Sequence, residues 1–210
     1  KTIDHPAFPK IIDICIVDDE FYLVMDYIEG KSLDDILKDG IVSESTVLDW
    51  AEQLADGLNY LHSGNPVMLY MDCKPSNIIV GRDGKLKLVD LGSIYLKGIK
   101  AGGRISGTYG YASPEQIKGE IVDERSDIYA YGRTLKRMLM GGGSKSMKYK
   151  RSLKTMNKII KKSTSKNPSR RYQSMGEILH TLQSRDTLYE KVMYILGGLI
   201  SYSYKMLIGL

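Results

Sequence analysis

Cysteine is scarce in this chain of 210 residues, which contains only Cys15 and Cys73. The two lie far apart and form neither a CxxC pair nor a spacing typical of metal ligands. This excludes a disulfide scaffold and favours a reducing compartment. The chain also begins at Lys1 without an initiator methionine or a signal peptide, so we expect it to be a fragment.

Acidic residues are absent from residues 128–176, although the net charge of the whole chain is only +5. Lysines and arginines crowd residues 145–171 instead. A surface of one sign attracts acidic substrates or anionic lipid, but a solvated helix face explains the same pattern equally well. We expect no nucleic-acid partner, because aromatic residues for base stacking are not interleaved with these charges.

Apolar patterning predicts strands first and helices afterwards, which is an α+β order. Strands are expected over residues 11–17, 21–27, 77–80 and 85–89, the last two joined by a turn at 81–84. Helices are expected from Leu33 after a Ser32 cap, and over residues 43–62, 124–140, 149–163 and 174–183. A loop rich in glycine and lysine covers residues 92–106.

The chemistry is concentrated in one loop and one turn. Asp72, Lys74 and Asn77 lie in the loop that follows the helix over 43–62, and Asp90 opens an Asp-Leu-Gly turn further on. Asp72 can accept or orient a substrate hydroxyl, and Lys74 can neutralise charge on a phosphate. Asn77 and Asp90 supply hard oxygen ligands for Mg²⁺. The set predicts phosphoryl transfer.

This pattern resembles the catalytic loop and metal-binding turn of the eukaryotic-type serine/threonine protein kinases, including their bacterial members. The resemblance extends over residues 3–182 and includes a hinge-like segment, a substrate-docking segment and two buried supports at residues 25–30, 107–115, 127–132 and 167–172. It implies a protein-kinase-like fold with a mostly helical C-terminal lobe and the last strands of a truncated N-terminal lobe. The implied division is 1–30 for the remnant and hinge, 31–185 for the C-terminal lobe and 186–210 for an apolar tail.

The resemblance also implies ATP as the phosphate donor and a site for its adenine. Met25 corresponds to the gatekeeper, and Ile79 to the apolar floor under the base. The backbone carbonyl of Asp26 and the backbone amide and carbonyl of Ile28 would bind the adenine edge. Asp90 would act on the phosphates through Mg²⁺.

Two further features follow from the resemblance. Thr108 would contact both Asp72 and Lys74, which is typical of the serine/threonine branch, so a protein substrate with Ser or Thr hydroxyls is expected. Asp127 would hold the catalytic-loop backbone, and Arg171 would pair with Glu115. Cys73, beside Asp72, is better explained as a small packing residue than as a redox site.

Three departures from the family pattern bear on activity. No Gly-rich phosphate loop, strand lysine or helix glutamate occurs in the sequence, so we expect this chain alone to be weak or inactive. Met71 stands where the family usually has an arginine that binds an activation-loop phosphate, which predicts activity independent of such a phosphate. Leu91 replaces the commoner phenylalanine and is a mild change.

The last residues form an uncharged run over 192–204, followed by Lys205 and a short apolar end. One interpretation is a truncated transmembrane helix over 192–210, which would anchor a cytoplasmic kinase domain and bring the basic region 145–171 to the membrane. The other is an extra helix that packs on the domain.

The leading hypothesis is therefore a serine/threonine protein kinase. The alternative is a pseudokinase or scaffold that binds protein partners without catalysis; the presence of Asp72, Lys74, Asn77 and Asp90 argues against it. A small-molecule phosphotransferase of the same fold is disfavoured by the docking segment at 107–115.

Overall fold

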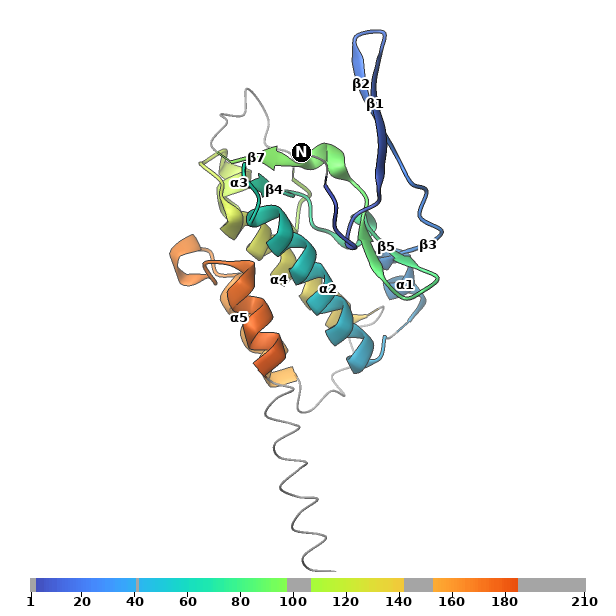
Figure 1. Ribbon diagram of the computed structural model, residues 1–210. Helices are drawn as coiled ribbons and strands as arrows, with labels where there is room; N and C mark the ends of the chain where they lie inside the picture. The colour runs from blue at the N-terminus through green and yellow to red at the C-terminus, as the bar shows by residue number, and fades with distance from the viewer. Residues whose placement is uncertain (1–2, 41, 98–106, 142–152, 185–210) are drawn as a thin grey trace, which may run out of the picture.

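The computed structural model describes residues 3–40, 42–97, 107–141 and 153–184 (Figure 1). Its elements in chain order are β1 (Ile11–Val17), β2 (Glu20–Met25), β3 (Gly30–Ser32), α1 (Leu33–Asp39), α2 (Glu44–His62), β4 (Met68–Leu69), β5 (Ile78–Gly81), β6 (Leu86–Leu88), β7 (Tyr95–Leu96), α3 (Pro114–Lys118), α4 (Glu124–Met140) and α5 (Leu153–Ser163). Single 3-10 turns occupy Pro75–Asn77, Leu91–Ser93 and Pro168–Arg170, and residues 175–184 are helical. The predicted α+β class is confirmed.

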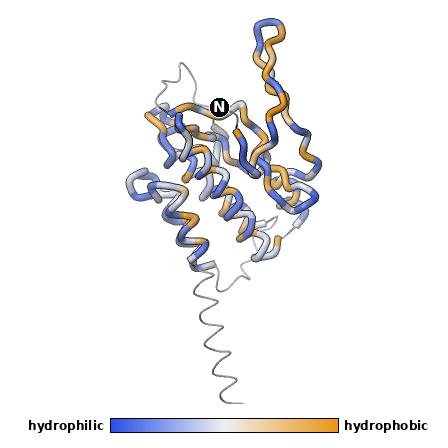
Figure 2. Tube along the Cα trace, viewed as in Figure 1, coloured by the Kyte–Doolittle hydropathy of each residue, from blue (hydrophilic) through white to orange (hydrophobic). Residues whose placement is uncertain are grey.

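The first two strands form an antiparallel hairpin that projects from the body of the molecule (Figure 1). Asp18 and Asp19 make its turn with φ values of 50° and 63°, the left-handed region that a tight two-residue hairpin turn requires. The second strand ends at Met25, earlier than the sequence predicts. Apolar residues predominate along both strands of the hairpin, and its turn is hydrophilic (Figure 2).

The helix starts are set by serine caps, as the sequence predicts. The Ser32 hydroxyl accepts a hydrogen bond from the backbone N–H of Asp35 and opens α1. Ser43 does the same for the N–H of Thr46 and opens α2. Such caps satisfy backbone donors that the first turn of a helix leaves unpaired.

The main core lies between the long helices. α4 packs against α2 on one side and α5 on the other, and the hydroxyl of Tyr131 donates to the carbonyl of Ala51 over 3.1 Å. α2 contributes the buried face that its periodicity predicts, and the helix over 175–184 adds Met175, Ile178 and Leu182. This packing holds α2 and α4 as a rigid base for the loop between them.

A second sheet joins the segment after β2 to the strands after the catalytic loop. β5 lies between β3 and β6, with Ser32 opposite Ile79 and Ile79 opposite Lys87. The predicted hairpin over 77–89 is therefore confirmed, except that Asn77 ends a 3-10 turn rather than beginning the strand.

Two short strands, β4 and β7, were not predicted from the sequence. Within the expected loop over 92–106, Tyr95–Leu96 forms β7 and pairs with β4, so Met68 lies opposite Leu96; residues 98–106 lie outside the described ranges. Of the predicted helix over 149–163, residues 149–152 also lie outside them, and α5 is described from Leu153.

No helix within the described ranges is long and apolar enough to cross a membrane. The tail over 192–210, on which the membrane interpretation rests, lies outside those ranges. Membrane anchoring therefore stays a prediction.

Candidate active site

The loop that carries Asp72 is held by hydrogen bonds to Asp127 of α4. The buried carboxylate of Asp127, in the first turn of α4, accepts hydrogen bonds from the backbone N–H groups of Tyr70 and Met71, both at 2.7 Å. Met71 has a φ of 68°, so the backbone turns sharply just before Asp72. The predicted support by Asp127 is confirmed.

Three further side chains hold this loop and were missed from the sequence. Nε2 of His62 donates to Oδ2 of Asp127 over 2.8 Å, Nε2 of Gln116 donates to the carbonyl of Met71 over 3.0 Å, and the hydroxyl of Thr134 donates to the carbonyl of Cys73 over 2.8 Å. Signals existed for two of them. Ser113 and Gln116 have the spacing of a capping box, and Thr134 lies two helical turns after Asp127, on the same face of α4.

Asp72, Lys74 and Thr108 form one connected group. The ammonium of Lys74 lies 2.6 Å from Oδ2 of Asp72 and donates to the hydroxyl of Thr108 over 2.6 Å. The backbone N–H of Thr108 donates to Oδ1 of Asp72 over 3.2 Å. The structure thus brings a residue from the docking segment onto the catalytic loop. It fixes the Asp72 carboxylate beside a positive charge.

Asn77 and Asp90 are connected to the same carboxylate. The side-chain amide of Asn77 donates to Oδ2 of Asp72 over 3.0 Å and to Oδ2 of Asp90 over 3.2 Å. Within the described ranges no group of three or more His, Cys, Asp and Glu side chains gathers around one point. The donor set nevertheless suits Mg²⁺, which typically takes one or two carboxylates and completes its shell with water and substrate phosphates.

The four predicted adenine residues lie on β2, on β5 and in the segment between β2 and β3. The pocket that two of them line does not include Asp72, Lys74 or Thr108. Ile79 is partly buried on β5, next to β3, and β3 follows the hinge-like segment. Asp26 and Ile28 line a pocket of about 520 Å³ together with residues 3–6 and 8–11 and Lys87. Met25 packs at the edge of the main core. The adenine roles of these four residues stay predictions.

Comparison with known proteins identifies the family. A family model described as protein kinase domain matches residues 1–194. The chain belongs to the eukaryotic-type serine/threonine protein kinases.

Individual relatives agree with this family. Over 152 residues the chain is 37% identical to receptor-like kinase LIP2 of Arabidopsis thaliana. This match covers 66% of this chain and 27% of that protein. Over 218 residues it is 30% identical to serine/threonine-protein kinase PrkC of Bacillus subtilis, covering 91% of this chain and 33% of that protein. The chain therefore spans a third or less of these relatives.

The fold is also that of known kinase structures. The crystal structure of the PknI kinase domain of Mycobacterium tuberculosis superposes with a TM-score of 0.69 at 20% identity, covering 88% of this chain and 74% of that chain. At this identity the likeness concerns the fold alone. The predicted kinase-like fold is confirmed.

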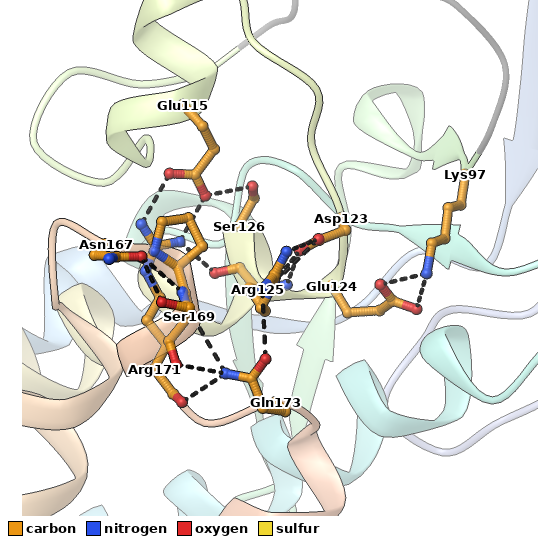
Figure 3. A network of polar contacts seen from close by, with 11 residues as sticks. Lys97, Glu115, Asp123, Glu124, Arg125, Ser126, Asn167, Ser169, Arg171 and Gln173 are labelled. Carbon is orange, nitrogen blue, oxygen red and sulfur yellow. Dashed lines mark hydrogen bonds and ion pairs between the residues drawn. The ribbon is translucent and has the colours of Figure 1, made fainter.

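The ion pair expected from the kinase family is present and buried. Nη1 of Arg171 lies 2.5 Å from Oε1 of Glu115, and Nη2 donates to Oε2 over 2.8 Å (Figure 3). Ser126 donates to the same carboxylate over 2.8 Å, and Arg171 also donates to the backbone carbonyl of Arg125 over 2.7 Å. Burial acts to raise the pKa of Glu115, but the hydrogen bonds from Arg171 and Ser126 outweigh it and the pKa lies below its ordinary value.

Two residues of the catalytic loop are packing elements. Tyr70 is fully buried in the main core, and burial raises the pKa of its hydroxyl. Cys73 is also fully buried, and burial raises the pKa of its thiol far above the ordinary value. A thiol held in the neutral form is a poor nucleophile. This agrees with a packing role for Cys73 rather than a redox one.

Proposed function

We propose that this chain carries the catalytic-loop half of a serine/threonine protein kinase, which transfers the γ-phosphate of ATP to a Ser or Thr hydroxyl of a protein. The observation that carries the proposal is the group formed by Asp72, Lys74 and Thr108, because it joins a carboxylate, a cation and the docking segment. The division into residues 1–30, 31–185 and 186–210 is part of the proposal.

In this proposal the substrate hydroxyl approaches the Asp72 carboxylate. Its oxygen forms a bond to the γ-phosphorus while the bond from that phosphorus to the bridging oxygen of ADP breaks. The hydroxyl proton passes to Asp72, and ADP leaves with the bridging oxygen. Lys74, 2.6 Å from Asp72, stabilises the negative charge of the transferring group.

Asn77 and Asp90 would hold Mg²⁺ in this arrangement. The ion would neutralise charge on the nucleotide phosphates when bound. To act as a ligand, Asn77 would present its side-chain oxygen, since the nitrogen of the same amide already donates to Asp72 and Asp90. Met25, Asp26, Ile28 and Ile79 would position the adenine.

The experiment is a phosphorylation assay on the protein as its full gene encodes it. A generic protein substrate is incubated with Mg²⁺ and γ-labelled ATP, and the labelled amino acids are separated after hydrolysis. We expect phosphoserine and phosphothreonine. A protein that binds ATP or partners without labelling any substrate would instead be the pseudokinase or scaffold.

The 210-residue chain is assayed beside it. We expect little or no turnover from this chain alone, because its sequence contains no Gly-rich phosphate loop and no strand lysine to hold the phosphates. Turnover near that of the full gene product would contradict this part of the proposal.

A further inference from the structure

A second pocket lies on the helical side of the molecule, formed by α5, the helix over 175–184 and the segment that joins them. It has a volume of about 520 Å³. Lys158 and Lys162 of α5 line it together with Tyr172, Glu177 and His180. None of the residues assigned to phosphoryl transfer belongs to its lining.

The charge in this pocket is mainly positive. Within the described ranges, Glu177 is the only acidic group of the lining, and its Oε2 lies 3.7 Å from Nζ of Lys162. Both side chains of that pair are more than 40% exposed, so water weakens it. In the same ranges no ion pair is found for Lys158 or His180.

The neighbouring surface has the same sign. Lys154 and Lys161 are exposed on α5, and Lys166 is exposed just after it. No acidic residue occurs in the sequence from 128 to 176, so this stretch offers no local carboxylate to neutralise them. A field of one sign attracts ligands of the opposite sign and speeds their encounter.

The shape of the pocket favours a side chain over a flat surface. Tyr172 is 4% exposed and forms an aromatic wall, and the ammonium of Lys162 lies 3.9 Å above the centre of its ring. This contact holds Lys162 at the pocket. A hollow between two helices can admit a carboxylate side chain, whereas a planar membrane touches only the outer ends of the lysines.

We propose that this pocket docks an acidic segment of a protein partner, with a carboxylate held by Lys158 and Lys162. The inference concerns a surface separate from Asp72 and its neighbours. It therefore does not depend on the proposed function, and its test requires neither ATP nor turnover.

The test measures binding of a fluorescein-labelled peptide of alternating glutamate and glycine to the purified protein by fluorescence anisotropy at low ionic strength. A peptide with glutamine in place of glutamate is the control ligand. The Lys158→Gln/Lys162→Gln variant should bind the acidic peptide about five-fold or more weakly. The Lys154→Gln/Lys161→Gln variant removes the same charge from α5 outside the pocket and should change the affinity less than about two-fold.

Two further arms complete the test. The Lys158→Arg/Lys162→Arg variant keeps both charges and should keep most of the affinity. Equal losses in the two glutamine variants would show a diffuse basic surface and would overturn the inference. So would the absence of peptide binding to the unmodified protein, or binding only to vesicles of phosphatidylcholine with phosphatidylserine.

Discussion

Met71 is the residue at which the catalytic loop departs most clearly from the usual kinase pattern. An arginine at this place serves kinases that bind a phosphate on the activation loop. Here the side chain is 2% exposed and packs in a small apolar cluster with Leu69 and Val122. An apolar cluster has no cation for a phosphate. The structure therefore supports the hypothesis that activity does not depend on such a phosphate.

This hypothesis predicts the behaviour of two serines after Asp90. Ser106→Ala should leave the activity of the full gene product unchanged. Ser93→Ala should lower it modestly, because the Ser93 hydroxyl donates to the carbonyls of Tyr70 and Asp90 at 2.9 and 3.0 Å. Activity is measured with and without prior phosphatase treatment, together with Ser106→Asp and Ser93→Asp. Loss in an alanine variant with recovery in the matching aspartate variant would refute the hypothesis.

At the scale of elements, the buried pair of Glu115 and Arg171 ties the short α3 helix to the start of α4 and to the turn at Pro168–Arg170 (Figure 3). Arg171 is 1% exposed, so loss of its partner would leave a buried charge uncompensated. Glu115→Gln should therefore lower the free energy of unfolding by about 3 kcal/mol. Urea denaturation measures this. The control is Glu120→Gln, which removes an exposed partner of Lys118 and should cost below about 1 kcal/mol.

The same pair predicts a dependence on pH. The pKa of Glu115 is lower in the folded state than its ordinary value. The stability that this carboxylate contributes is therefore present above the ordinary carboxyl pKa and is lost as the pH falls through the pKa of the folded state. Between about pH 5 and pH 3 the unmodified protein should lose more stability than the Glu115→Gln variant. Parallel loss in the two proteins would contradict this account of the pair.

Most elements could be predicted because each has a local cause. Helical periodicity and serine caps predict α1 and α2, and the turn residues predict the hairpins around Asp18 and Gly84. β4 and β7 could not be predicted, since two residues are too few for any periodicity and their pairing joins distant segments. The same holds for His62 in the site. Its bond to Asp127 depends on how α2 and α4 pack.

At the scale of the whole molecule, the β1–β2 hairpin projects from the body of the described chain (Figure 2). Ile14, Ile16 and Phe21 are each more than 60% exposed and share one face, and Ile12, at the irregularity between Ile11 and Asp13, is 61% exposed. Within the described ranges the hairpin is a two-stranded sheet on its own, so its outer edges are unpaired. Exposed apolar surface and free strand edges promote association.

The 210-residue chain should therefore bind an apolar dye such as ANS and scatter light increasingly with concentration. The Ile14→Lys/Phe21→Lys variant should reduce both signals by about half or more, because it places charge on the exposed face. Ile121→Lys changes an exposed side chain outside the hairpin, 97% accessible, and should leave both signals unchanged. Equal signals from the hairpin variant and the unmodified chain would show that the hairpin face does not cause the association.

The central claim is that Asp72 and its neighbours transfer phosphate, and the rate of transfer by an Asp72→Asn variant tests it most directly. Asparagine keeps the size of the side chain but can neither accept the hydroxyl proton nor carry the charge that faces Lys74. In the full gene product we expect the rate to fall by about 10²-fold or more, with the nucleotide affinity little changed. Asp49→Asn, on the exposed side of α2, should keep the full rate. A full rate from Asp72→Asn would contradict the account.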